Sequence, residues 1–195
     1  CLLIVAVGMT FVILTGGIDL SVGAVIAFST VLLASLVQHH GWHPLPAIGA
    51  VLVLGTGFGA LMGVLIERYR LQPFVVTLAG MFLARGAATL VSVDSIGIDH
   101  AFHVAVASLR IPLGGRTSIS AGALIALLVV AAGALLAAKT RFGRTVYAIG
   151  GNVHSAHLMG LPVERTLVQV YALSGFCSAL AGVVYTFYML SGYSL

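Results

Sequence analysis

The chain has 195 residues, of which 60% are hydrophobic and only 7% are charged, and its formal net charge is +4. A soluble globular domain carries roughly a quarter charged residues, so this composition lacks the polar surface that such a fold needs. Disorder is excluded too, because a disordered chain needs low hydrophobicity and high charge. The composition is typical of a membrane protein.

Six apolar blocks follow one another when the charged residues are used as boundaries: Leu2–Leu14, Ile18–Val37, Leu45–Ile66, Pro73–Val93, Ile119–Ala138 and Leu167–Leu190. The last five each hold at least 20 residues, enough for a helix to cross the roughly 30 Å hydrocarbon core. The first block is too short to cross. We therefore predict an all-α, polytopic transmembrane helical bundle with about five full spans and a truncated N-terminal one.

Basic residues predict the orientation of the bundle, because cytoplasmic loops hold an excess of Lys and Arg. The connections Glu67–Arg70 and Lys139–Arg165 hold six basic residues, against two, Arg110 and Arg116, in the opposite connections. We expect the two richer connections to face the cytoplasm. The basic residues form no run, so no nucleic-acid partner is indicated.

Small residues recur at helical spacing within two of the blocks. Gly55, Gly59 and Gly63 share one helix face, and Gly175 with Ala179 repeats the pattern. Such residues let membrane helices approach closely, so we interpret them as helix contacts. Cys1 and Cys177 lie far apart and predict packing rather than a disulfide or a metal site.

No cofactor, metal site or catalytic residue is predicted. The GxGxxA match at Gly55 lies inside an apolar block and follows no strand, and the P-loop pattern is absent, so energy for any transport has to come from a partner or a gradient. A serine protease site at Ser174 lacks a base, since all seven histidines fall in predicted loops. The clusters at His39–His43 and Asp99–His103 are interpreted as solvated loop residues.

Asp19 lies in a glycine-rich break between the first two blocks, where a carboxylate is costly unless something stabilises it. Two interpretations stay open. Asp19 or Ser21 caps the next helix at the membrane interface, or the break is a discontinuous helix that reaches a transport pathway. Arg85, the basic residue inside a predicted span, is a pathway residue, a partner of Asp19 or a residue that snorkels toward the interface.

The connection 139–165 contains a predicted short helix between glycine hinges. Asn152 is expected to cap it, Gly160 to end it and Pro162 to break the chain beyond. Val153, Ala156 and Met159 recur at i, i+3 spacing and give a narrow apolar stripe. The stripe suits either a partner's groove or the bilayer surface.

Several of these segments together resemble the permease subunits of bacterial sugar-importing ABC transporters, the ribose, xylose and galactofuranose group. The resemblance is carried in order by Val7–Leu14, Gly16–Gly23, Thr77–Gly86, Arg141–Arg144 and Tyr147–Gly160. It is greatest for the galactofuranose permeases. Because the family chain is longer, the resemblance also implies that residues 1–195 are a single permease domain, incomplete at both ends.

The resemblance implies a transport function without an enzyme activity in this chain. It implies an ABC ATPase subunit, a second permease in a homo- or heterodimer, a periplasmic sugar-binding protein and a multi-pass location in the bacterial inner membrane. Residues 139–165 would be the coupling segment that receives the ATPase motion, with Gly150 and Gly151 as its pivot. The implied coupling residues are Arg144, Tyr147, Gly150, Gly151, Asn152, Ala156, Met159 and Gly160.

The pathway candidates are Gly17, Asp19, Ser21, Thr77 and Arg85. We predict the permease subunit of an ABC importer for a monosaccharide, with galactofuranose as one candidate. The alternatives are an ion-coupled secondary transporter that uses Asp19 as its ion site, and a purely structural membrane subunit.

Overall fold

The computed structural model describes residues 1–114 and 117–193, with the backbone alone over 111–114 and 117–118. Within these residues the chain forms helices α1 (Leu2–Leu14), α2 (Val22–Gln38), α3 (Pro44–Tyr69), α4 (Pro73–Val91), α5 (Ala101–Ser108), α6 (Ala121–Lys139), α7 (Arg141–Gly151), α8 (Val153–Leu158) and α9 (Val163–Met189). Four short strands accompany them: β1 (Ile96–Gly97), β2 (Arg110–Gly114), β3 (Thr117–Ser120) and β4 (Ser191–Gly192).

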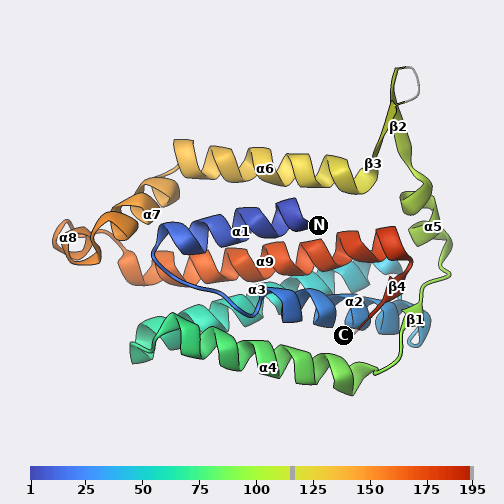
Figure 1. Ribbon diagram of the computed structural model, residues 1–195, viewed down its shortest axis with the longest axis horizontal. Coiled ribbons are helices and arrows are strands. Elements are labelled where there is room, and N and C mark those ends of the chain that lie inside the picture. The colour runs from blue at the N-terminus through green and yellow to red at the C-terminus, as the bar shows by residue number, and fades with distance from the viewer. Residues whose placement is uncertain (115–116, 194–195) are drawn as a thin grey trace.

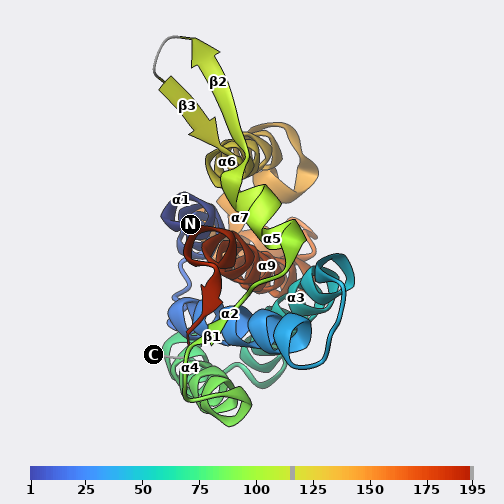
Figure 2. The same cartoon turned by 90° about the vertical axis from the view of Figure 1, so that its right-hand side faces the viewer.

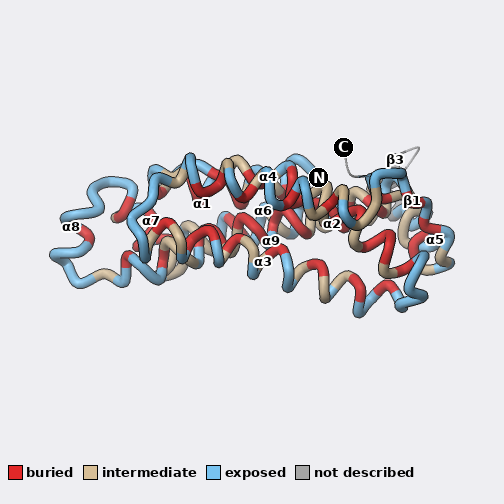
Figure 3. Tube along the Cα trace, turned by 90° about the horizontal axis from the view of Figure 1, so that it is seen from below, coloured by how far each residue is buried: buried red, intermediate tan, exposed pale blue. Residues whose placement is uncertain are grey.

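The long helices lie along one common direction and form an elongated bundle (Figure 1). The central helix, α9, contacts α1, α2 and α3. Seen from the end, α6 lies on one side of α9 and α4 on the opposite side, beyond α2 (Figure 2). Buried residues follow the inward faces of these helices, whereas the outward faces stay exposed (Figure 3). The predicted helical membrane fold is confirmed.

The second predicted span is shorter than expected. Within the described residues, α3, α4, α6 and α9 are the four helices long and apolar enough to cross a membrane. Helix α2 begins at Val22 rather than Ile18 and has 17 residues, about 26 Å of helix against a core of roughly 30 Å. The difference arises because Gly16–Ser21 is not helical, so the apolar block contains a break at its start.

Small residues form the seam between α3 and α9, as predicted. A side-chain carbon added at Gly55 would lie 2.5 Å from Cβ of Ala179, and one added at Gly63 would lie 2.8 Å from Cα of Val168. Carbons added at Gly59 or Gly175 would collide with the backbone of the facing helix. Direct backbone contact of this kind holds membrane helices together where the hydrophobic effect cannot.

The two connections predicted to be cytoplasmic lie at the same end of the bundle, next to α7 and α8 (Figure 1). They are largely helical rather than loops. Helix α3 continues through Glu67 to Tyr69 and ends at Arg70, whose left-handed backbone (φ 51°) closes the last turn. Helix α6 contains Lys139, and α9 begins at Val163. Arg110 lies toward the opposite end, and Arg116 is outside the described residues.

The opposite end contains structure that the sequence did not predict. Strand β1 pairs with β4, and β2 pairs with β3; both pairs are antiparallel. Helix α5 lies between β1 and β2 in the chain. The β2–β3 hairpin projects away from the bundle (Figure 1).

The interpretation of the histidines as solvated loop residues is wrong at His103, whereas His43 and His100 lie in loops and cap the helices that follow. His43 and His100 accept the N–H groups of Leu45 and Phe102 through Nδ1 and so cap α3 and α5. The His103 side chain is fully buried in α5, and its ring centroid lies 4.9 Å from that of Phe187. Burial, with a smaller effect from His100, lowers the pKa of His103 to about 4.

Candidate functional site

The break between α1 and α2 returns the chain to the middle of the bundle. Helix α1 lies toward the α7–α8 end and α2 toward the other end, and the segment between them runs back along the bundle (Figure 1). The reversal begins with hydrogen bonds from Gly16 N to Ile13 O (2.9 Å) and from Gly17 N to Val12 O (3.0 Å). Gly16 has φ +77°, a conformation that favours glycine.

The Asp19 carboxylate is the centre of a buried hydrogen-bond cluster. Its Oδ1 accepts bonds from the Ser21 N–H (2.9 Å) and the Ser21 hydroxyl (2.6 Å). Its Oδ2 accepts a bond from the Ser174 hydroxyl of α9 (2.6 Å). Asp19 is 6% exposed and Ser174 is 1% exposed. A carboxylate at this depth is tolerable because three donors satisfy its charge.

Side chains of α9 and α4 lie near the carbonyl group of Ile18. Tyr171 of α9 and Thr77 of α4 each place a hydroxyl 3.4 Å from Ile18 O, a long distance for a hydrogen bond. Thr77 makes its shorter bond, 2.8 Å, to Pro73 O within its own helix. Gly17 leaves room for Tyr171, since a side-chain carbon there would lie 2.6 Å from the Tyr171 oxygen.

The cluster lies in the interior of the bundle. Ser174 is roughly 16 Å along α9 from the first residue of that helix, at 1.5 Å rise per residue. The carboxylate precedes the N-terminus of α2, where the helix dipole favours negative charge. Asp19 bonds to Ser21, the residue before α2, but among the described residues no side chain accepts an N–H group of the helix itself at this end. The predicted cap of α2 by Asp19 or Ser21 is therefore wrong, and the carboxylate lies at a buried position.

Four of the five pathway candidates gather at this break: Gly17, Asp19, Ser21 and Thr77. The fifth, Arg85, does not. Its side chain is exposed on α4, and among the residues that the structure describes no ion pair joins it to Asp19. A role for Arg85 as the partner of Asp19 is therefore wrong, because three hydroxyl and amide donors already occupy the carboxylate.

Sequence reasoning missed Tyr171 and Ser174 as members of the cluster. Both are buried, and Ser178 continues the same line by donating to Ser174 O (2.8 Å). The available signal was a polar residue at i, i+3 and i+7 inside an apolar block, which places all three on one helix face.

The α7–α8 segment lies against the other end of the break. Thr140 caps α7 by accepting the Gly143 N–H (3.1 Å). Asn152 caps α8 by accepting the Ser155 N–H (2.9 Å), and Gly160 takes φ +72° beyond its end. The predicted cap and stop are confirmed. The structure adds α7, a helix that the sequence did not predict.

Gly150 and Gly151 are the last two residues of α7 and not a loop between helices. Gly150 lies directly against the backbone of α1: a carbon added there would collide with Leu14 O. Nothing lies within 4 Å of a carbon added at Gly151. Of the two predicted hinge residues, Gly150 is a contact point between α7 and the start of the break, and Gly151 is not.

The predicted apolar stripe of α8 divides into a buried and an exposed part. Ala156 is fully buried with Ile149 and Val163, so its side chain faces the bundle and not a partner. Met159 is 66% exposed, and Val153 is exposed as well. Arg144 and Tyr147 are exposed on α7, and Asn152 and Gly160 are exposed at the ends of α8.

Metal binding has no support in the described part of the chain, where no three His, Cys, Asp or Glu side chains come together. A cavity of about 910 Å³ lies between the N-terminal residues of α1, the start of α6 and the end of α9. A second cavity, of about 520 Å³, lies between the ends of α3 and α9 next to the α7–α8 segment. Neither is lined by the residues of the break.

Comparison with known proteins places the chain in one family. The family model described as branched-chain amino acid transport system / permease component matches residues 1–194. The chain is 52% identical to the inner membrane ABC transporter permease protein YjfF of Escherichia coli K12, over 98% of this chain and 58% of that protein. It is 45% identical to the fructose import permease protein FruG of Bifidobacterium longum, over 95% of this chain and 56% of FruG.

A third relative is the ribose import permease protein RbsC of Bacillus subtilis, 40% identical over 94% of this chain and 56% of RbsC. No solved structure gives a significant match. The chain spans somewhat more than half the length of these curated relatives. Since the family model covers residues 1–194, the chain belongs to the branched-chain amino acid transport system / permease component family, and it is similar to permeases of sugar ABC transporters.

Proposed function

We propose that this chain forms part of the pathway for a monosaccharide in an ABC importer of the bacterial inner membrane. The observation that carries the proposal is the contact between an exposed helical segment and a buried polar break. Helix α7 touches the backbone at Leu14 through Gly150, and Asp19 lies five residues further along the same connection. A transporter of this kind needs such a link between a surface that receives force and the interior that responds.

The force enters, in this proposal, through residues 139–165. Arg144, Tyr147 and Met159 present exposed side chains to the ATPase subunit. Ala156 contributes from inside, because it packs α8 onto Ile149 of α7 and Val163 of α9. A displacement of α8 therefore reaches the break by two routes, through Gly150 to Leu14 and along α9 to Ser174.

The substrate is proposed to be a monosaccharide because the printed names of the relatives refer to ribose and fructose import. Galactofuranose remains a prediction from the sequence resemblance. The proposed partners are an ABC ATPase subunit, a second permease and a periplasmic sugar-binding protein.

The second candidate function, ion-coupled transport through Asp19, is disfavoured by the bonding of the carboxylate. Three donors from the chain itself point at its two oxygens. A residue that binds and releases an ion in each cycle would have to lose these bonds each time, at a cost of about 1–3 kcal/mol for each buried group left unpaired. We propose instead that Asp19 holds the start of α2 in place and that Gly17, Ser21 and Thr77 shape the pathway beside it.

Uptake by proteoliposomes tests the proposal. The purified permease, its ATPase and its binding protein are reconstituted, and entry of labelled ribose, fructose and galactofuranose is measured with ATP or with a proton gradient alone. Uptake of at least one sugar should require ATP and the binding protein. Uptake that follows the proton gradient without the ATPase would overturn the proposal and favour the ion-coupled alternative.

A further inference from the structure

The cavity between the C-terminal end of α3 and the N-terminal end of α9 is lined mainly by charged side chains. Its walls carry Arg68 and Arg70 from the α3 end and Arg165 from α9. Helix α3 has 26 residues, about 39 Å, and therefore extends beyond a hydrocarbon core of roughly 30 Å. Tyr69, 67% exposed beside the cavity, is the residue type that concentrates at the membrane interface.

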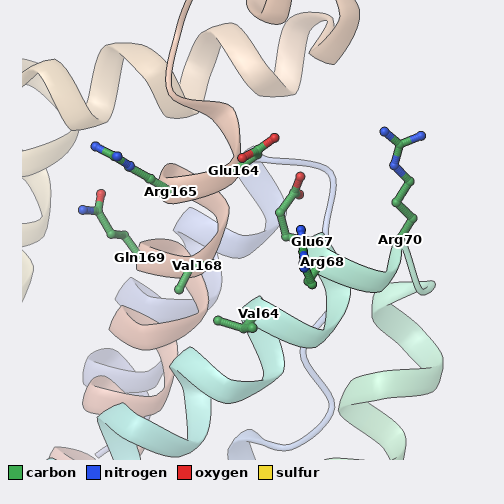
Figure 4. A pocket seen from close by; sticks show the side chains of 8 residues that line it. All are labelled: Val64, Glu67, Arg68, Arg70, Glu164, Arg165, Val168 and Gln169. Carbon is green, nitrogen blue, oxygen red and sulfur yellow. The ribbon is translucent and has the colours of Figure 1, made fainter.

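The cavity has an apolar floor and a polar opening. Val64 and Val168 project from the two helices toward one another below the charged groups (Figure 4). Glu67 and Glu164 project toward the opening, with Arg165 on one side of them and Arg70 on the other (Figure 4). A molecule that fits has to offer hydrocarbon at one end and charge at the other.

The charged groups of the cavity are not paired with one another. Among the residues that the structure describes, no ion pair involves Glu67, Glu164 or the three arginines. Both signs therefore face the opening with their charges available. A ligand with only negative charge would bind the arginines but would be repelled by the two carboxylates. A headgroup that carries a phosphate and a protonated amine satisfies both sets.

We infer that this cavity binds the headgroup of a phospholipid with a primary amine, phosphatidylethanolamine in chemical class. Arg68 and Arg165 contact the phosphate, Glu67 and Glu164 accept hydrogen bonds from the ammonium group, and the acyl chains leave over Val64 and Val168. The volume of about 520 Å³ is in the range of small-ligand sites. Basic pockets between membrane helices on the cytoplasmic side are a recognised place for lipid headgroups.

Native mass spectrometry of the purified protein tests this inference. The protein is titrated with phosphatidylethanolamine, phosphatidylcholine and phosphatidylglycerol of the same acyl chains. Phosphatidylethanolamine should be retained about fivefold better than phosphatidylcholine, whose methylated amine cannot donate, given about 1 kcal/mol for exposed charge contacts. The double variant Glu67→Gln with Glu164→Gln should remove that preference, and Arg68→Gln with Arg165→Gln should weaken retention of all three lipids.

The control variant is Lys139→Gln, which removes a basic residue at the same end of the bundle but outside the cavity. It should bind all three lipids like the unchanged protein. Equal retention of the three lipids by the unchanged protein, or a preference for phosphatidylglycerol, would overturn the inference. So would loss of ATPase co-purification in the arginine variant with unchanged lipid binding, because the cavity would then be a subunit contact.

Discussion

Polar groups gather both at the break between α1 and α2 and at the cavity between the ends of α3 and α9. The two regions differ in whether those groups are paired within the chain. At the break, Asp19 is buried and bonded to donors from the chain itself. At the cavity, the charged side chains face the opening, and the described residues include no ion pair among them. A buried polar group without a partner destabilises the fold, whereas an exposed charge without a partner costs little free energy because water solvates it. We therefore interpret the paired Asp19 as a residue that maintains the geometry of the bundle, and the unpaired charges of the cavity as a surface that binds another molecule.

The largest effect is expected from removing the Asp19 carboxylate. Asp19→Ala leaves the Ser21 N–H and the Ser174 hydroxyl without their acceptor inside the bundle, at a cost of about 1–3 kcal/mol for each buried group left unpaired. Thermal unfolding in detergent should show a lower midpoint, and uptake should be lost.

Asp19→Asn separates geometry from charge at the same position. The amide keeps an acceptor oxygen for the start of α2, and serine hydroxyls can accept from its NH₂ group. Uptake and unfolding should therefore stay much closer to those of the unchanged protein than in Asp19→Ala. If the Asp19→Asn variant inserts into the membrane and unfolds normally but has no uptake, the charge of Asp19 is itself needed for transport. The assignment of Asp19 to a purely structural role would then be wrong.

The next effect is expected at the contact between α7 and the break. Gly150→Ala places a methyl group against the Leu14 carbonyl, whereas Gly151→Ala places one in open space. Overpacking typically costs about 1–3 kcal/mol, so sugar-stimulated ATPase activity should fall in Gly150→Ala and much less in Gly151→Ala. An equal fall in both variants would assign the effect to the ATPase surface instead of the contact with α1.

A smaller effect is expected from Ser174→Ala, which removes one donor to Asp19 and should cost about 1 kcal/mol. Ser178→Ala is the matched control, because Ser178 is equally buried on the same face of α9 but bonds only to the Ser174 backbone. Uptake should decrease in the first variant and not in the second. Identical behaviour of the two would mean that the link from α9 to the break has no role in transport.

The smallest effect concerns His103, the buried side chain of the described residues whose ring nitrogens have no hydrogen-bond partner. Its pKa in the folded protein is about 4, below its usual 6.5. The packing of α5 is therefore fully favoured above about pH 6.5 and weakens as the pH falls from 6.5 toward 4. Fluorescence of Trp42, the single tryptophan, should report the change.

His103→Leu is the control for that titration, since it keeps the packing of α5 and removes the ionisable ring. The pH dependence of Trp42 fluorescence over this range should become smaller. The rings of His43 and His100 contact each other nearby and are present in both proteins, so the comparison is between the pH dependence of the variant and that of the unchanged protein. Unchanged pH dependence in the variant would show that His103 does not set it.

The parts of the fold that the sequence predicted are those with local causes. Apolar length identified the helices α3, α4, α6 and α9, small residues at helical spacing identified the α3–α9 seam, and Asn152 and Gly160 marked the ends of α8. Asp19 could be singled out because a carboxylate in an apolar region is costly wherever it lies.

The remaining features depend on contacts between distant residues. Ser174 joins Asp19 across more than 150 positions, and a polar face on an apolar helix gives no indication of which residue it will contact. The interior start of α2 was missed because apolar composition does not distinguish a helix from the non-helical residues before it. The role of Gly150 depends on α1 passing beside it, which local spacing cannot reveal.

The glycine seam has a mechanical consequence for the bundle. Gly55 and Gly59 of α3 meet Gly175 of α9 backbone to backbone, so sliding one helix past the other would drive carbonyl groups into the opposite main chain. The two helices thus form a single rigid body about 40 Å long. Any displacement of α9 has to carry α3 with it, and the bond from Ser174 to Asp19 ties the connection between α1 and α2 to the same body.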